Sequence, residues 1–284
     1  MKKIQLTLVC LFISLVCFGQ FGTDSLPIAS SVMDKKLMAA ITFPDGYEKS
    51  KDRFPVLYLL HGGSGSFSDW HKKVTEKGLV QRMANEHDLI IVTPGVGPSS
   101  YYFDSPLMDS VQYATYIIKE LIPFIDKKYR TLAQRESRAI AGLSMGGHGA
   151  ITLAAKNPKL FIAAGSMSGV MNIDTRMWKV PDNFRKRRQG QQAAMLGKIQ
   201  YDAPFSKYTA VGLVPELEKA DLAIIIDCGV DDFLIETNRQ MHKLLLDKKI
   251  DHEYIERPGA HTWPYWTEAL PVQMMFFDKY LKRN

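Results

Sequence analysis

The sequence predicts an α/β fold, in which a doubly wound, mostly parallel sheet carries an inserted cap-like segment. Short apolar runs alternate with longer stretches whose apolar residues recur at helical spacing, an order typical of strand–helix–strand units. From Phe54 onward these runs are apolar throughout instead of alternating with polar residues, as expected for strands covered on both faces. One polar, basic stretch between two apolar runs departs from this alternation.

The expected elements cover most of the chain. Seven runs are expected as strands: Leu37–Pro44, Phe54–Leu60, Asp88–Pro94, Ser137–Leu143, Phe161–Ser168, Asp221–Gly229 and His252–Glu256. Four stretches are expected as helices: Val111–Tyr129, Met145–Asn157, Ile235–Lys249 and Trp266–Lys282. Pro123 is placed to kink the first helix, because proline lacks a backbone donor. With 284 residues and a hydrophobic fraction of 46%, residues 21–284 can form one domain whose core needs no metal or disulfide.

The interrupting segment, Met171–Lys219, is polar, basic and irregular, and it lies between two expected core strands. We interpret it as a cap or lid; a packed surface excursion is the plainer alternative. It contains the densest basic run of the chain, Phe184–Gly190 (FRKRRQG). A solvated loop or helix face explains this run better than a nucleic-acid contact, since no zinc-finger, helix-turn-helix or RNA-binding motif accompanies it. No nucleic-acid partner is therefore expected.

Residues 1–20 have the layout of a secretory signal peptide. Lys2 and Lys3 precede an almost uninterrupted apolar run, Ile4–Phe18, and small and polar residues follow it. The alternative, a membrane anchor, is disfavoured because this run is shorter than the ~20 residues that a spanning helix needs. Cleavage would leave Cys228 without an intramolecular partner and 34 of the 36 Lys and Arg against 30 Asp and Glu, a net charge of +4. We expect a secreted or periplasmic protein with no stable membrane insertion after cleavage.

The stretch Gly142–Gly146 (GLSMG) predicts a nucleophilic serine at Ser144. It follows an expected strand and opens an expected helix, and a sharp turn at that place lifts a serine hydroxyl clear of the sheet. The glycines on either side avoid Cβ collisions in so tight a turn. The alternative is a glycine-rich helix start with a buried serine. The combination of strand, turn and helix favours the nucleophile.

Chain order selects the base. In folds that carry this motif, the serine is followed along the chain by the acid and then by the histidine. His261 satisfies this order and lies in a Pro/Gly loop, RPGAHTW, after a strand-like run, where active-site side chains of open α/β sheets project. His148 follows Ser144 on the same helix before any suitable acid, so it is expected to pack near the turn as a neutral residue. His252 lies in a strand-like run and is expected to have a structural role.

The acid is expected after the run AIIIDCG, where two adjacent carboxylates lie. Asp227 lies inside the strand and is expected to be structural. Asp231 and Asp232 follow it, and only one of them can orient His261, because adjacent side chains project in different directions. The role of this acid is to hold the imidazole tautomer and to stabilise the imidazolium. Spacing alone does not choose between the two.

Backbone donors for an oxyanion are expected at two places. Gly62 and Gly63 follow His61 directly after a strand, a position that supplies an N–H beside the nucleophile in this motif. The second donor is the N–H of Met145, the residue after the serine. The sequence contains no recognisable metal-ligand motif and no glycine-rich nucleotide loop, so neither a metal nor a cofactor is expected.

Several blocks together resemble the esterase D-like family of α/β hydrolases, which includes feruloyl esterases, acetyl esterases and S-formylglutathione hydrolases. These blocks are VLYLLHGGSGSFSDW, ELIPFIDKKY, RAIAGLSMGGHGA, GVDDFL and YIERPGAHTWPYW. The resemblance spans nearly the whole chain after residue 20 and implies an α/β-hydrolase fold. It implies Ser144 as nucleophile, His261 as base and Asp232, in preference to Asp231, as acid. It also implies an oxyanion hole from Gly62 or Gly63 with Met145.

These observations lead to the hypothesis of a secreted serine carboxylesterase that forms an acyl-enzyme on acyl or feruloyl esters of carbohydrate. A signal peptide would be out of place in a cytosolic formylglutathione hydrolase, so the substrate, a small-molecule or oligosaccharide ester, is expected outside the cytoplasm. Tyr101, Tyr102 and Trp263 could stack on a sugar or phenolic ring; core packing is their alternative role. Two other hypotheses are an acyltransferase of the same fold and a non-catalytic carbohydrate-binding relative.

Overall fold

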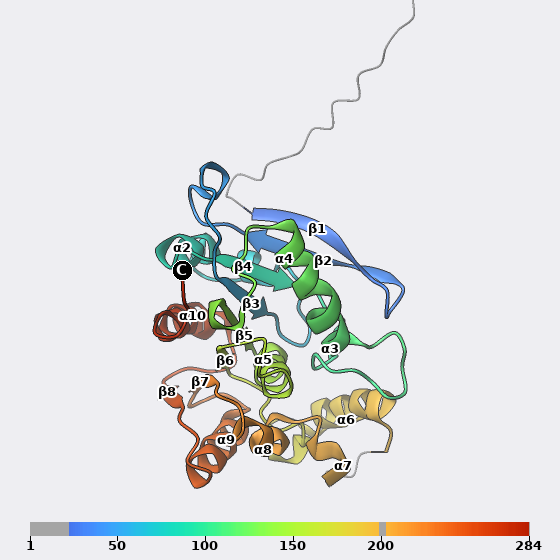
Figure 1. The fold of residues 1–284 in the computed structure, drawn as a ribbon. Coiled ribbons are helices and arrows are strands. Elements are labelled where there is room, and N and C mark those ends of the chain that lie inside the picture. The colour runs from blue at the N-terminus through green and yellow to red at the C-terminus, as the bar shows by residue number, and fades with distance from the viewer. Residues whose placement is uncertain (1–22, 199–202, 284) are drawn as a thin grey trace, which may run out of the picture.

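An eight-stranded sheet forms the centre of the protein (Figure 1). The computed structural model describes residues 23–198 and 203–283, so the expected signal peptide lies outside the described residues. The strands follow the order β1-β2-β4-β3-β5-β6-β7-β8. β1 pairs with β2 and β2 with β4 in antiparallel fashion, whereas every other neighbouring pair is parallel. The predicted α/β fold with a mostly parallel sheet is confirmed.

Each of the seven predicted strands is present. Their bounds are β2 (Lys35–Thr42), β3 (Val56–Leu60), β4 (Ile90–Pro94), β5 (Arg138–Leu143), β6 (Ala163–Met167), β7 (Ala223–Gly229) and β8 (Glu253–Arg257). β1 (Thr23–Ser30) has no counterpart among the sequence predictions. It contains Pro27, a residue that argues against a strand in the middle of a sheet. β1 is an edge strand, however, and a proline is tolerated there because its missing N–H can face away from the neighbouring strand.

Helices cover both faces of the sheet (Figure 1). One face carries α3 (Tyr113–Thr115), the π-helical segment η2 (Tyr116–Leu121), α4 (Ile122–Lys128), α5 (Met145–Lys156) and α9 (Ile235–Asp247). The other carries α1 (Asp69–Lys72), α2 (Leu79–Glu86) and α10 (Trp263–Asp278). Successive residues of β3 belong to two hydrophobic cores. Tyr58 and Leu60 pack in the core on the side of α5, and Leu57 and Leu59 pack in the core on the side of α10. This double burial explains why the strand is apolar throughout.

The helix predicted over Val111–Tyr129 is continuous but changes its type. Pro123 lies in the first turn of α4, directly after the π-helical segment η2. Proline is tolerated at this place because the N–H groups of a first helical turn have no partner within the helix. Pro123 therefore marks a change from π to α geometry. Two 3₁₀ turns, η1 (Tyr47–Lys49) and η3 (Arg135–Ser137), complete this half of the chain.

The segment Met171–Lys219, expected to be irregular, is largely helical. Its elements are η4 (Thr175–Met177), α6 (Asp182–Leu196), α7 (Ala203–Ser206), η5 (Ala210–Leu213) and α8 (Val214–Leu217). The expectation was wrong for α6 because most of its positions are charged or polar, and its buried residues cluster in the last turns. The apolar periodicity that identifies other helices is therefore missing. The FRKRR run belongs to α6 and not to a loop.

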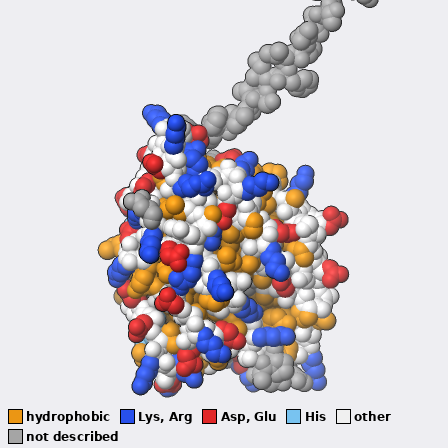
Figure 2. Space-filling model, viewed as in Figure 1, with side chains coloured by type: hydrophobic (Ala, Val, Ile, Leu, Met, Phe, Trp, Pro, Cys, Tyr) orange, Lys and Arg blue, Asp and Glu red, His pale blue; other side chains and the backbone are white. Residues whose placement is uncertain are grey.

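The surface carries charges of both signs. On the face shown in Figure 2, Lys and Arg side chains are interspersed with Asp and Glu, and hydrophobic side chains appear between them. This mixed pattern fits the modest net charge of +6 for the whole sequence. Among the described residues, no helix is both long and apolar enough to span a membrane.

Candidate active site

Ser144 lies at a strained turn between β5 and α5. Its backbone adopts φ 56° and ψ −117°, a region that residues other than glycine rarely occupy. The turn is possible because neighbouring backbones approach very closely: a Cβ on Gly146 would lie 2.6 Å from the carbonyl oxygen of Leu60, and one on Gly142 would lie 2.5 Å from Gly146. The Ser144 N–H donates to the carbonyl of Met167 on β6 at 2.9 Å, which ties the turn to the sheet. Ser144 thus faces a pocket at the carboxyl edge of the sheet.

Three side chains from different loops form one hydrogen-bonded chain in this pocket. His261, after β8, places Nε2 at 2.9 Å from Ser144 Oγ. Its Nδ1 lies 2.8 Å from Oδ2 and 3.1 Å from Oδ1 of Asp232, after β7. A carboxylate only accepts, so Nδ1 carries the proton and Nε2 is free to accept from the serine hydroxyl. Asp231 is exposed, so the structure selects Asp232 from the adjacent pair.

Packing holds the carboxylate and the imidazole in place. The Asp232 side chain is fully buried, and its Oδ1 also accepts from the N–H of Leu234 at 2.8 Å. The ring of Phe233 lies 4.4 Å from the His261 ring on one side. Trp266 meets the imidazole edge-on, with the ring centroids 4.9 Å apart, and its own N–H donates to Ser168 Oγ. The imidazole therefore has little freedom to rotate away from Ser144.

His61 fixes the loop that carries the expected oxyanion donors. Its Nε2 accepts from the N–H of Val96 at 3.1 Å, so the proton sits on Nδ1, which donates to the carbonyl of Gly62 at 2.8 Å. Burial lowers the pKa of His61, which keeps the ring neutral as this pattern requires. A Cβ on Gly63 would lie 3.8 Å from Cβ of Met145, so the loop faces the start of α5. Gly62, Gly63 and Met145 line the pocket together with Ser144.

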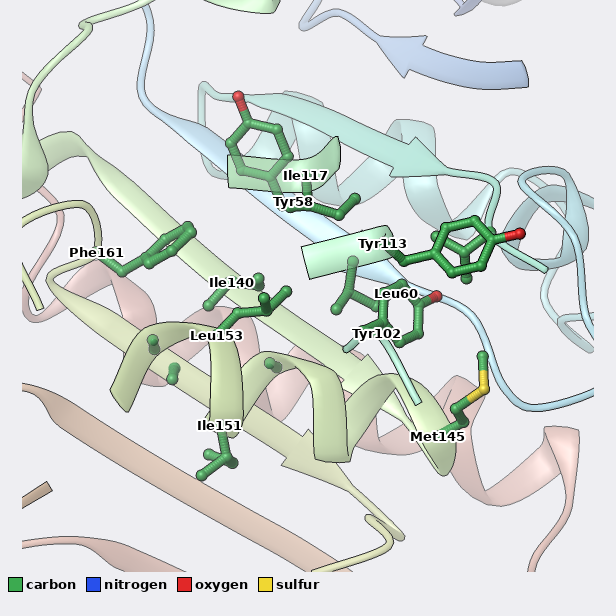
Figure 3. Packing of buried hydrophobic residues seen from close by; sticks show 14 of the residues in the cluster. Tyr58, Leu60, Tyr102, Tyr113, Ile117, Ile140, Met145, Ile151, Leu153 and Phe161 are labelled. Atoms are coloured by element: carbon green, nitrogen blue, oxygen red, sulfur yellow. The ribbon is translucent and has the colours of Figure 1, made fainter. Parts of the chain in front are cut away.

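The three aromatic residues expected to bind substrate lie in different places. Trp263 and Tyr101 line the pocket, although only 3% of Tyr101 is exposed. Tyr102 is not on the pocket surface, and that expectation was wrong. It belongs to the buried cluster near Met145 (Figure 3), and its hydroxyl donates to the carbonyl of His61 at 3.0 Å. Tyr102 thus supports from behind the loop at Gly62 and Gly63, the expected oxyanion loop.

The pocket has a volume of about 280 Å³, and its walls include four large side chains that were not expected from the sequence. They are Trp178, Phe184, Arg188 and Phe233. Phe184 and Arg188 are four residues apart in α6 and therefore share one helix face. This spacing within FRKRR is the signal that could have separated them from the solvated positions around them. In the part of the chain that is described, no group of three or more His, Cys, Asp or Glu side chains is arranged to hold a metal ion.

Asp227 supports the loop that carries His261. It is buried at the end of β7, where it pairs with Arg257 at 2.5 Å and accepts from the hydroxyl of Tyr265. Burial raises the pKa of this carboxyl, and the two partners act in the opposite direction. The Tyr265 ring in turn packs against Gly259, two residues before His261, whose φ of 139° suits glycine. Asp227 thus has the structural role that the sequence predicted.

His148 lies behind the turn and is completely buried. Its Nδ1 faces the carbonyl of Tyr101 and its Nε2 the carbonyl of Tyr208, both at 2.9 Å. A neutral imidazole has a single N–H, so the ring donates to one of these two carbonyls and packs against the other. Burial lowers its pKa to about 4, and the two carbonyls oppose this change only in part. His148 is a neutral structural residue at neutral pH and does not contact Ser144 through its side chain.

This burial predicts an acid-sensitive contribution to stability. As the pH falls below 6.5, the unfolded chain protonates at His148 before the folded protein does, so the free energy of unfolding decreases until the pH reaches the folded pKa of about 4. The difference between these pKa values corresponds to on the order of 3 kcal/mol. Urea unfolding should show that the free energy of unfolding decreases less between pH 7 and pH 4 for His148→Asn than for the wild type. An equal decrease in the free energy of unfolding for the two proteins over this pH range would contradict the prediction.

The match to known proteins settles the family. The model of the Esterase family matches residues 30–277, nearly the whole described chain. The chain belongs to the Esterase family. This esterase is 28% identical to an acetyl esterase of Caldicellulosiruptor saccharolyticus over 239 residues, which cover 80% of this chain and 85% of the relative. It is also 28% identical to an S-formylglutathione hydrolase of Rattus norvegicus, over 76% of this chain and 77% of that protein.

Solved structures agree with this assignment. This esterase superposes on a ferulic acid esterase with a TM-score of 0.74 and 28% sequence identity, over 91% of this chain and 98% of the other. The resemblance to esterase D-like α/β hydrolases is therefore confirmed. The protein has the α/β-hydrolase fold and is a carboxylic ester hydrolase.

Proposed function

We propose that this protein is an exported serine esterase that removes acetyl or feruloyl groups from carbohydrate through an acyl-enzyme. One observation carries the proposal: the continuous hydrogen-bonded chain from Asp232 through His261 to Ser144, which opens into a pocket beside Gly63 and Met145. Nucleophile, base and orienting acid are each within hydrogen-bond reach of the next, which is the arrangement that acyl transfer through serine requires.

Each residue has a defined step in this mechanism. His261 Nε2 takes the proton from Ser144 as Oγ attacks the ester carbonyl, and Asp232 stabilises the imidazolium that forms. The N–H of Met145 and an N–H of the loop at Gly62 and Gly63 stabilise the developing oxyanion. Met145 is suited to this because it is the first residue of α5, where N–H groups lack partners within the helix.

The second half of the cycle uses the same groups. His261 returns the proton to the leaving alcohol, which departs as the acyl-enzyme forms on Ser144. A water molecule then gives its proton to His261 and attacks the acyl carbonyl. The tetrahedral intermediate collapses, the acid leaves, and the proton returns to Ser144 Oγ.

The substrate class is supported by the relatives and by the size of the pocket. The similar proteins include an acetyl esterase and a ferulic acid esterase. A volume of about 280 Å³ with walls that include Tyr101, Trp178 and Trp263 fits a short acyl group or one phenolic ring. Export is proposed from the leader-like sequence of residues 1–20.

One experiment tests location and substrate class together. The 284-residue sequence is expressed in bacterial cells, and the fraction outside the cytoplasm is assayed on acetylated xylo-oligosaccharides, feruloylated arabinoxylo-oligosaccharides and 4-nitrophenyl acetate. We expect the enzyme in this fraction, cleaved near residue 20, to release acetate or ferulate. Full-length protein retained in the cytoplasm would contradict export, and activity on the aryl ester alone would contradict the carbohydrate substrate. Transfer of the acyl group to an added sugar would identify the enzyme as an acyltransferase.

A further inference from the structure

The pocket contains a cationic side chain that the proposed mechanism does not use. Arg188 reaches the pocket from α6, and its guanidinium group lies close to the oxyanion loop. A Cβ on Gly63 would be 3.7 Å from Nη2 and 3.8 Å from Nη1 of this group. Any substrate whose carbonyl lies beside Gly63 and Ser144 therefore passes close to Arg188.

Neutral groups hold the guanidinium in this position. Nη1 donates to Ser99 Oγ and, at 3.1 Å, to Oε1 of Gln191 one turn later in α6. The ring of Phe184 lies 5.1 Å from the guanidinium carbon. These contacts orient the group before substrate arrives, which reduces the entropy lost on binding. None of them neutralises its charge.

The charges that line the pocket do not balance. Besides His261, the charged residues in the lining are Asp69, Lys73 and Arg188. Asp69 and Lys73 pair with each other at 2.7 Å. Within residues 23–198 and 203–283, Arg188 forms no ion pair, whereas Arg185 on the same helix pairs with Asp182 at 2.7 Å. The Asp232 carboxylate lies behind His261 and is not part of the lining, so the pocket surface itself has one surplus positive charge, at a partly buried position where an anion would be attracted more strongly than at the open surface.

We propose that Arg188 is a specificity-determining residue that binds a carboxylate carried by the ester substrate. The planar fork of a guanidinium matches the two oxygens of a carboxylate, and charge-assisted hydrogen bonds of this kind are the strong ones. The carboxylate can belong to the alcohol part, as in an ester of a uronic acid, or to the acyl part, as in a half-ester of a dicarboxylic acid. This inference rests on the proposed function, because it concerns the same pocket.

Matched pairs of small esters separate the two sources of the carboxylate. For the alcohol side, 3-acetoxybenzoate is compared with 3-acetoxybenzamide. For the acyl side, mono-4-nitrophenyl adipate is compared with 4-nitrophenyl hexanoate. The measured quantity is the ratio of kcat/KM for the anionic ester to kcat/KM for its neutral partner. Because each ratio is compared between enzymes, differences in the intrinsic reactivity of the esters cancel.

Three variants are measured beside the wild type. Arg188→Gln removes the charge, Arg188→Lys keeps the charge without the fork, and Arg187→Gln removes the same charge from the exposed neighbouring position. We expect Arg188→Gln to lower the ratio by on the order of tenfold or more in at least one pair, chiefly through KM. Arg188→Lys should recover part of this loss, and Arg187→Gln should leave the ratio unchanged.

Two results would overturn the inference. The first is an unchanged ratio in both pairs for Arg188→Gln. The second is an equal loss on anionic and neutral esters, which would mean that Arg188 acts on the oxyanion or on the shape of α6. In both cases turnover of the neutral esters still supports the proposed esterase. If the wild-type enzyme hydrolyses neither member of either pair, the proposed function and this inference fail together.

Discussion

Replacing Ser144 by alanine should lower kcat for ester hydrolysis by on the order of 10⁵-fold or more, because it removes the hydroxyl that His261 is placed to deprotonate. The protein should stay folded. Alanine and serine both carry a Cβ, so the strain at φ 56° is the same in both, and the substitution removes the hydroxyl that hydrogen-bonds to His261. We expect the free energy of unfolding to change by no more than about 1 kcal/mol. Initial rates on 4-nitrophenyl acetate and urea unfolding measure the two effects.

A covalent probe provides the control for this prediction. A fluorophosphonate should add one label to the wild-type enzyme, on the peptide that contains Ser144, and none to Ser144→Ala. A folded variant that retains more than about one hundredth of the wild-type rate would show that Ser144 is not the nucleophile. The same result would leave the fold and the family assignment intact.

Replacing Asp232 by asparagine should lower kcat at neutral pH by on the order of 10⁴-fold. An amide nitrogen at this place can donate to Nδ1, so the imidazole proton moves to Nε2, the atom that has to accept from Ser144. Because asparagine is nearly isosteric and its oxygen can still accept from the N–H of Leu234, the geometry should be kept. Steady-state kinetics should show the loss in kcat with little change in KM, as expected for a group that acts on the transition state.

The adjacent acid is the matched control. Asp231→Asn makes the same chemical change one residue earlier, at an exposed side chain. Its backbone N–H donates to the carbonyl of Gly259 at 2.9 Å, and the substitution does not alter that hydrogen bond. We expect kcat within about twofold of the wild type. A large decrease in kcat for Asp231→Asn, together with a small decrease for Asp232→Asn, would contradict the proposed triad.

The elements near the nucleophile were predictable because their patterns are local. An apolar run, a serine between glycines and a helical pattern follow one another within Arg138–Lys156, and each step depends only on neighbouring residues. The choice of His261 over His148 needed only the order of residues along the chain. β1 was not predictable in this way, because a strand with Pro27 is stable only as the edge of a sheet whose other strands come later in the sequence.

The order and type of residues along the chain were enough to predict the α/β architecture, the position of Ser144, the histidine that reaches it and the glycines beside it. Only the folded protein shows which of two adjacent acids turns inward, that Tyr102 is buried behind the loop at Gly62 and Gly63, and that α6 brings Phe184 and Arg188 into the pocket. The difference lies in the range of the interactions. Periodicity and turn geometry are set by neighbours along the chain, whereas the direction of a loop side chain and the inner face of a polar helix depend on contacts between distant segments.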